Sequence, residues 1–240
     1  MIELEIRQFA GIETLHATPA GKRDQPLPTV LFYHGFTSSK LVYSYFAVAL
    51  AQAGFRVVMP DAPEHGARFS GDEAQRLVQF WPILYGNLME FDALVAALNA
   101  EKLIENARLG VGGASMGGMT ALGIMTHFPA VKCVASLMGS GYFTALSQML
   151  FPSQNAAKSL AALADWDVTH QLDRLAGRPL LLWHGEEDDV VPATETLRLQ
   201  QALVQAGLDG HLTCLWEAGV RHRITPGALT ATTDFFRAHL

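Results

Sequence analysis

The chain of 240 residues has little cysteine, few basic residues and no long apolar run. Its two cysteines, Cys133 and Cys214, lie far apart inside apolar segments, as buried free thiols do in a reducing compartment. The 17 Lys and Arg residues are outnumbered by 23 Asp and Glu residues, and the formal net charge of −6 offers nothing to attract a phosphate backbone or an anionic lipid. No window approaches the roughly 18 consecutive apolar residues of a membrane span, and Glu3 and Glu5 stand where a signal peptide carries positive charge. We expect a cytoplasmic protein with neither nucleic acid nor a membrane as its partner.

The sequence also lacks the common motifs of metal and cofactor sites. It contains no His-Glu-x-x-His, no Cys-x-x-Cys and no phosphate-binding loop of the Walker type. The glycine-rich run at 110–115 has no acidic residue about 20 positions later, as a nucleotide-binding turn would require. We therefore expect neither a metal nor a cofactor.

Short apolar segments alternate with stretches of helical spacing along the chain. Because these segments are continuously apolar rather than alternating, they predict strands buried on both faces, as in a parallel sheet. Their ranges are 29–33, 55–60, 108–114, 133–138, 179–183 and 212–216. Segments 4–9 and 15–17 have no helix between them and predict an antiparallel hairpin at one edge. The pattern indicates an α/β fold with a mostly parallel, twisted sheet and helices on both faces, in one domain over 1–240.

Two segments, 62–88 and 139–175, interrupt this alternation. Each follows the carboxyl end of a predicted strand, which is the side on which open α/β sheets bind ligands. Both segments are therefore candidate pocket walls.

The strongest chemical signal is Gly113-Ala-Ser115-Met-Gly117, which matches G-x-S-x-G. A predicted strand precedes Ser115 and a predicted helix, 116–128, follows it. Glycines on both sides permit a sharp turn that exposes the hydroxyl, and the helix N-terminus favours negative charge beside it. Ser115 is the candidate nucleophile.

A serine nucleophile needs a histidine base, and the histidine needs a carboxylate to orient it. On folds with this turn, the acid and then the histidine follow the serine in the chain, each at a strand end. Strand 179–183 is followed by four competing carboxylates, Glu186, Glu187, Asp188 and Asp189. Strand 212–216 is followed by His222, the only one of the nine histidines that stands third in this order after a strand.

Two backbone N–H groups are candidates for stabilising an oxyanion. One belongs to Met116, which directly follows the nucleophile. The other belongs to Phe36, because Gly35 permits a sharp turn after strand 29–33.

Through these and further motifs, which together cover residues 30 to 240 or so, the chain resembles members of the α/β-hydrolase superfamily. The further motifs include His34-Gly-Phe-Thr-Ser-Ser39, Pro60-Asp-Ala-Pro-Glu-His-Gly66 and Gly219-Val-Arg-His222. The chain is most similar to small bacterial carboxylesterases of the dienelactone-hydrolase-like and prolyl-oligopeptidase-like branch. In that branch's His-Gly-x-x-Asp-x-x-Val-Pro pattern the aspartate is the acid, and the resemblance implies Asp188 for that role. The nucleophile here is a serine, whereas dienelactone hydrolases proper use a cysteine.

The resemblance implies a serine carboxylesterase that cleaves small-molecule esters. Segment 139–175 lies where this fold carries its cap, and its length of fewer than 40 residues predicts a short cap and a preference for short acyl chains. Phe69, Trp81, Phe143 and Phe151 are candidate pocket residues, although some bulky side chains of these segments are expected to belong to the core. Among enzymes, the alternative is a thioesterase or a peptidase with the same triad. Outside enzymes, the alternative is a noncatalytic ligand receptor on this fold. Both a monomer and a homodimer are compatible with the sequence.

Overall fold

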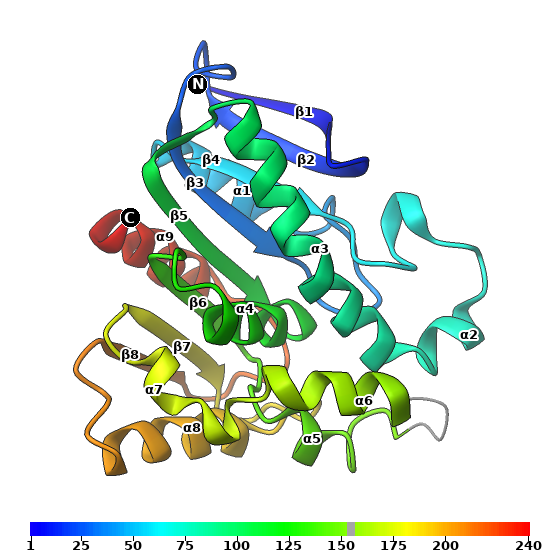
Figure 1. Ribbon diagram of the computed structural model, residues 1–240. Coiled ribbons are helices and arrows are strands. Elements are labelled where there is room, and N and C mark those ends of the chain that lie inside the picture. The colour runs from blue at the N-terminus through cyan, green and yellow to red at the C-terminus, as the bar shows by residue number, and fades with distance from the viewer. Residues whose placement is uncertain (153–156) are drawn as a thin grey trace.

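A computed structural model describes residues 1–152 and 157–240. Its centre is an eight-stranded sheet in the order β1-β2-β4-β3-β5-β6-β7-β8 (Figure 1). The strands are β1 (Ile2–Phe9), β2 (Ile12–Pro19), β3 (Leu27–Tyr33), β4 (Arg56–Pro60), β5 (Ile104–Ala114), β6 (Cys133–Leu137), β7 (Leu180–Gly185) and β8 (Leu212–Glu217). Strands β3 to β8 pair in parallel, whereas β1 and β2 form an antiparallel hairpin at one edge. The predicted mostly parallel sheet with an edge hairpin is therefore confirmed.

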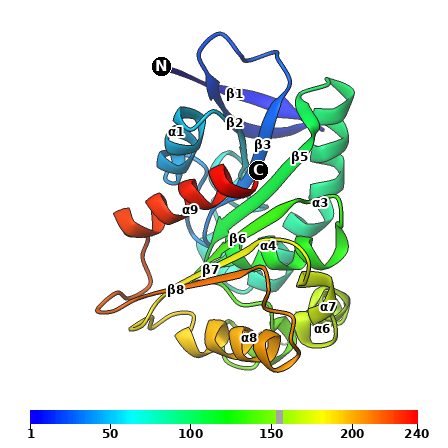
Figure 2. The ribbon, with the colours of Figure 1, turned by 90° about the vertical axis from the view of Figure 1, so that its left-hand side faces the viewer.

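Helices cover both faces of the sheet, as Figure 2 shows edge-on. Helices α1 (Ser44–Gln52) and α9 (Pro226–His239) pack on one face, where Phe46 and Phe236 are fully buried. Helices α3 (Phe80–Ala100), α4 (Met116–His127) and α8 (Ala193–Gln205) contribute to the core on the other face. Among the described helices, none combines the length and the apolar character that a membrane crossing needs.

The two segments that interrupt the alternation follow β4 and β6. The first contains a 3₁₀ turn, Gly66–Arg68, and the short helix α2 (Glu73–Leu77). The second contains α5 (Phe143–Leu146), α6 (Ala157–Leu163), two 3₁₀ turns (Ala164–Trp166 and Val168–His170) and α7 (Leu172–Leu175). Residues 153–156 of the expected cap lie outside the described residues.

The structure corrects two predicted boundaries. Residues 80–88, expected to be irregular, form the start of α3, whose buried stripe of Phe80, Ile83 and Leu84 has ordinary helical spacing. Strand β5 begins at Ile104, four residues before the predicted start at Arg108. Polar residues, Glu105, Asn106 and Arg108, interrupt its partly exposed first half, so it lacks the continuous apolar signal on which the prediction relied.

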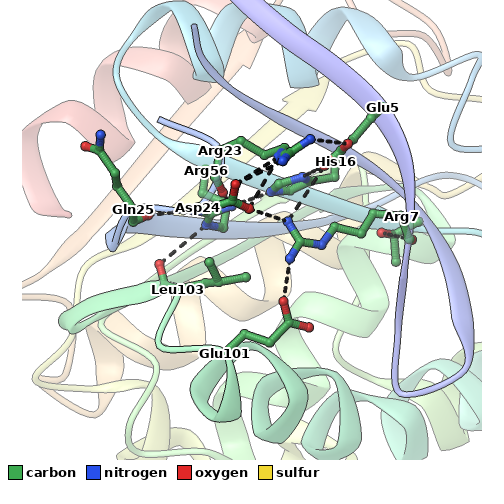
Figure 3. A network of polar contacts seen from close by, with 10 residues as sticks. Glu5, Arg7, His16, Arg23, Asp24, Gln25, Arg56, Glu101 and Leu103 are labelled. Carbon is green, nitrogen blue, oxygen red and sulfur yellow. Dashed lines mark hydrogen bonds and ion pairs between the residues drawn. The ribbon is translucent and has the colours of Figure 1, made fainter. Parts of the chain in front are cut away.

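A buried arginine ties the edge hairpin to the rest of the sheet (Figure 3). Arg56, at the amino end of β4, is fully buried and donates hydrogen bonds to the carbonyl oxygens of Gln25 (2.6 Å) and Arg23 (2.9 Å). It also contacts Nε2 of His16 on β2. Arg56 lies at the opposite end of β4 from the segment that follows Pro60, so this network supports the fold at a distance from the site described below.

Both cysteines are free. Cys133 lies on β6 and Cys214 on β8, and β7 separates the two strands. Adjacent strands are about 4.8 Å apart, so two intervals exceed the separation of about 7 Å that a disulfide tolerates. The expectation of free thiols is confirmed.

Candidate active site

Ser115 sits on a strained turn between β5 and α4. Its backbone has φ of +57° and ψ of −120°, which non-glycine residues rarely adopt. The glycines on either side make the turn possible, because a Cβ on Gly113 would lie 2.2 Å from the carbonyl oxygen of Gly117. A Cβ on Gly117 would in turn lie 2.0 Å from the carbonyl oxygen of Tyr33. The G-x-S-x-G pattern thus holds Ser115 at the carboxyl end of β5, directly before α4.

The three side chains selected from the sequence lie in one hydrogen-bonded row. Ser115 Oγ is 2.8 Å from His222 Nε2, and His222 Nδ1 is 2.7 Å from Asp188 Oδ2. The serine comes from the end of β5, the aspartate from the loop after β7, and the histidine from the loop after β8. Because the carboxylate can only accept, His222 Nδ1 carries the proton and Nε2 is left free to accept from the serine hydroxyl. This arrangement can remove the hydroxyl proton as the serine attacks an electrophile.

Asp188 is held as a buried anion. Its side chain is 0% exposed, and its Oδ1 accepts backbone N–H bonds from Val190 (2.9 Å) and Val191 (3.0 Å). Its Oδ2 accepts a second histidine bond, from His184 Nε2 at 3.1 Å. Burial alone would raise the pKa of the Asp188 carboxyl, but the hydrogen bonds from the two histidines and the backbone outweigh it and hold that pKa well below its usual range.

The competing carboxylates of the same loop do not reach His222. Asp189 pairs with Arg221 at the surface, where their side chains are 45% and 68% exposed. Glu186 and Glu187 are also exposed. Of the four candidates, the structure brings Asp188 to His222.

The turn after β3 lies directly beside the serine. A Cβ on Gly35 would be only 3.4 Å from Ser115 Cβ. Next to Gly35, the backbone N–H of Phe36 donates to no group among the described residues, and the same holds for the N–H of Met116 at the start of α4. Two free N–H groups next to a nucleophile can receive the negative oxygen of a tetrahedral adduct.

A buried ion pair beneath this turn was not among the residues selected from the sequence. Lys40 pairs with Asp61, and their side chains are 2% and 1% exposed. Asp61 Oδ1 also accepts the backbone N–H of Lys40 at 2.8 Å, while Asp61 Oδ2 accepts that of Ala67 at 3.0 Å. The pair therefore fastens the loop after β3 to the loop after β4. For Asp61 the sequence offered two signals, its position directly after a buried strand and its place in the Pro60–Gly66 motif.

Two of the four predicted pocket residues are wrong. Trp81 is 1% exposed and Phe143 is 0% exposed, so both belong to the core rather than to a pocket wall. Trp81 is buried because it lies in the first turn of α3, where its Nε1 donates to the Leu150 carbonyl oxygen at 3.1 Å. An aromatic residue in an irregular stretch carries no sequence signal of which way it points.

The other two predicted pocket residues are partly exposed. Phe151 contacts Phe36 and Phe80, with ring centroids 5.0 Å and 4.7 Å apart, and Phe36 and Phe80 are 5.0 Å apart. This trio joins the turn beside Ser115 to α3 and to the segment after β6. Phe69 instead packs under the guanidinium of Arg76, 4.3 Å from the ring centroid.

Within the described residues, no group of three or more His, Cys, Asp or Glu side chains is arranged to hold a metal ion.

Comparison with known proteins identifies the family. The model of the prolyl oligopeptidase family matches residues 42–239. The chain belongs to this family. It is 61% identical to the esterase YjfP of Escherichia coli K12 over the full length of both chains. It is also 31% identical over both full lengths to YitV of Bacillus subtilis 168, whose name marks it as a candidate esterase.

Among solved structures, TT1662 from Thermus thermophilus superposes with a TM-score of 0.83 at 22% identity, covering 99% of this chain and 98% of the other. At that identity the likeness supports the fold alone. Together with the family match it confirms the α/β-hydrolase fold and the resemblance expected from the motifs.

Proposed function

We propose that this hydrolase of the prolyl oligopeptidase family is a serine carboxylesterase that cleaves small acyl esters through an acyl-enzyme intermediate. The observation that carries the proposal is the hydrogen-bonded row of Ser115, His222 and Asp188. Ser115 Oγ lies 2.8 Å from His222 Nε2, and His222 Nδ1 lies 2.7 Å from Asp188 Oδ2. Its full-length relative at 61% identity bears the name of an esterase.

In the first half of the reaction, Ser115 Oγ attacks the ester carbonyl carbon while His222 Nε2 takes the hydroxyl proton. Asp188 keeps His222 in the required tautomer and stabilises the imidazolium that forms. The N–H groups of Phe36 and Met116 hold the carbonyl oxygen as it becomes negative. The adduct then collapses, the bond to the alcohol oxygen breaks, and His222 returns the proton to the leaving alcohol.

In the second half, water replaces the alcohol. His222 Nε2 takes a proton from the water as its oxygen attacks the acyl carbon, and the second adduct releases the carboxylic acid. The proton passes back to Ser115 Oγ, so the enzyme returns to its starting state without a metal or a cofactor taking part in any step.

The aromatic trio of Phe36, Phe80 and Phe151 supports a preference for short acyl chains. It packs beside the turn that carries the proposed oxyanion donor and draws together the loop after β3, the start of α3 and the segment after β6. Three bulky rings at this position leave room for a short acyl group and exclude a long one. The free cysteines support a cytoplasmic location for the protein. We also propose that residues 1–240 form a single domain.

The proposal is tested with a panel of p-nitrophenyl esters from acetate to dodecanoate, run beside an acyl thioester and a peptide p-nitroanilide. We expect the short esters to be the best substrates, judged by kcat/KM. A fluorophosphonate probe should label the wild-type protein, with the adduct on Ser115. Faster cleavage of the anilide or the thioester would move the function to a peptidase or a thioesterase, and no labelling together with no hydrolysis would leave a binding protein.

A further inference from the structure

Two buried histidines flank the turn that carries Phe36. His34 and His65 are 2% and 0% exposed, and their ring centroids lie 5.3 Å apart. His34 belongs to the loop after β3 and His65 to the loop after β4. Among the described residues, neither ring has a hydrogen bond to Ser115, and the reaction described above uses neither.

The partners of His34 fix its tautomer. Its Nδ1 lies 2.7 Å from the carbonyl oxygen of Gly35, which can only accept, so Nδ1 carries a proton. Its Nε2 lies 3.0 Å from the backbone N of Ala62, which can only donate, so Nε2 carries a lone pair. His34 therefore reaches from its own loop to the loop after β4 and is neutral.

His65 makes the same connection in the opposite direction. Its Nδ1 donates to the carbonyl oxygen of Pro63 in its own loop at 2.8 Å. Its Nε2 accepts the backbone N–H of Thr37, in the loop after β3, at 2.9 Å. Each histidine thus donates within its own loop and accepts from the other loop.

These bonds fall on the two peptide groups that flank Phe36. The carbonyl of Gly35 and the N–H of Phe36 belong to one planar peptide group, so a bond to that carbonyl sets the direction of that N–H. The N–H of Thr37 belongs to the next peptide group, on the other side of Phe36. We propose that His34 and His65 are positioning residues that aim the Phe36 N–H at the developing oxyanion, His34 through the Gly35 carbonyl and His65 through the Thr37 N–H. This inference rests on the proposed function, because it needs Phe36 as an oxyanion donor.

The proposal requires both rings to be neutral, since a proton on either Nε2 would face a backbone N–H. Burial, the largest influence on each ring, lowers the pKa of His34 to about 4 and also lowers that of His65. Charged groups also act on the two rings. They are Asp61 and Lys40 for His34, and Asp61, Glu64 and Arg76 for His65. The 3.8 Å from His34 Nε2 to Asp61 Oδ1 is too long for a hydrogen bond, so the lone pair at Nε2 remains available to Ala62.

Two matched substitutions at His34 separate its two hydrogen bonds. The amide of His34→Asn can donate from the place of Nδ1 to the Gly35 carbonyl but does not reach Ala62. The longer amide of His34→Gln can accept from Ala62 at the place of Nε2 but leaves the Gly35 carbonyl with only the longer bond from the Ser38 N–H, at 3.3 Å. Loss of an oxyanion donor costs about 10² to 10³ in kcat, and misdirection of a donor costs part of that. We expect kcat to fall about 10- to 100-fold in H34Q and less than about fivefold in H34N, with KM changed less than about threefold in both.

At His65 the expected order is reversed. His65→Gln can still accept the Thr37 N–H from the place of Nε2, whereas His65→Asn retains only the bond to Pro63 in its own loop. We therefore expect H65Q to retain more kcat than H65N. A role confined to packing has no reason to reverse the order of the same two replacements between the two positions.

The readouts are kcat and KM for p-nitrophenyl butyrate, the melting temperature, and Ki for a trifluoromethyl ketone, whose adduct with serine carries an oxyanion. We expect Ki to rise by the factor by which kcat falls, while the melting temperatures within each Asn/Gln pair agree. The proposal is overturned if all four variants keep kcat within threefold of wild type, if the order is the same at both positions, or if only KM or the melting temperature changes. The proposed function fails separately, when wild-type protein hydrolyses no ester or when Ser115→Ala hydrolyses it equally well.

Discussion

Oδ2 of Asp188 lies 2.7 Å from Nδ1 of His222, although the two residues are 34 positions apart in the chain. The parallel pairing of β7 and β8 brings them together, because the loops that follow the two strands begin at the same edge of the sheet. Nε2 of His222 faces Ser115, and the direction of this hydrogen bond decides whether that nitrogen carries a proton or a lone pair.

Asp188→Asn reverses that direction. The amide oxygen can still accept from the backbone N–H groups of Val190 and Val191, which turns the amide NH₂ toward His222. An NH₂ group favours the tautomer of His222 that has its proton on Nε2, where it cannot accept from the serine hydroxyl. We expect kcat for p-nitrophenyl butyrate to fall about 10⁴-fold, as it does when the aspartate of a serine protease triad is changed to asparagine.

Asp189→Asn is the matched control. Asp189 makes its ion pair with Arg221 at the surface, and exposed pairs contribute at most about 1 kcal/mol. We expect kcat within about twofold of wild type. A larger loss in this variant than in Asp188→Asn would transfer the role of the acid to Asp189.

Ser115→Ala should abolish ester hydrolysis without loss of stability. The Ser115 hydroxyl has His222 as its hydrogen-bond partner and supports no core packing, and alanine tolerates the same turn about as well as serine does. Circular dichroism and the melting temperature should match wild type, while kcat falls by at least about 10³-fold. Residual activity within tenfold of wild type would falsify the assignment of the nucleophile.

The parts of the site that could be predicted are those with a local signal. Gly113, Ser115 and Gly117 lie within five consecutive residues, and a strand before them and a helix after them are visible as apolar patterns. His222 followed from its order in the chain. Asp188 could not be separated from Asp189 by spacing and needed the family pattern, because both follow the same strand within two residues.

The remaining parts depend on contacts between distant segments. Nothing local indicates that Lys40 pairs with Asp61, since the two loops meet only after β3 and β4 have paired. For the same reason Trp81 and Phe143 were misread as pocket walls. The direction of an aromatic side chain in an irregular segment depends on how the neighbouring helices pack, which the sequence does not display.

Acid should destabilise the fold between about pH 6.5 and pH 4. Burial lowers the pKa of both His16 and His34 to about 4, whereas in the unfolded chain each titrates near 6.5. In that range the unfolded state binds protons that the folded state does not, so stability is full above pH 6.5 and falls until the folded pKa is reached. By pH 5 each of these two histidines should lower the free energy of unfolding by about 2 kcal/mol.

Urea unfolding at pH 7, 6 and 5 measures this loss. His16→Gln supplies the control, because its amide oxygen can accept from Arg56 but takes up no proton in this range. We expect a shallower pH dependence in this variant. An unfolding free energy that stays constant from pH 7 to pH 5 in wild type would contradict neutral, buried histidines.

The two thiols should be inert in the native protein. Burial raises the pKa of Cys133 to about 12 and that of Cys214 to about 11, so the reactive thiolate is scarce at neutral pH. Titration with Ellman's reagent at pH 8 should show almost no reaction in native protein and two thiols in unreduced protein unfolded in guanidinium. Finding no thiol after unfolding would mean a disulfide and an error in the strand order.

Phe151 should limit the length of the acyl chain. Its ring packs on Phe36, in the turn beside Ser115, and on Phe80 at the start of α3. Each additional buried CH₂ contributes about 0.8 kcal/mol until space is exhausted, so kcat/KM should rise from acetate to butyrate and then decline. Phe151→Ala removes one ring of the trio and should move the optimum to hexanoate or octanoate. Met149→Ala, in the same segment but 66% exposed, should leave the optimum at butyrate. An optimum at twelve carbons or more in wild type would mean that the segment after β6 opens widely and that the trio does not bound the acyl site.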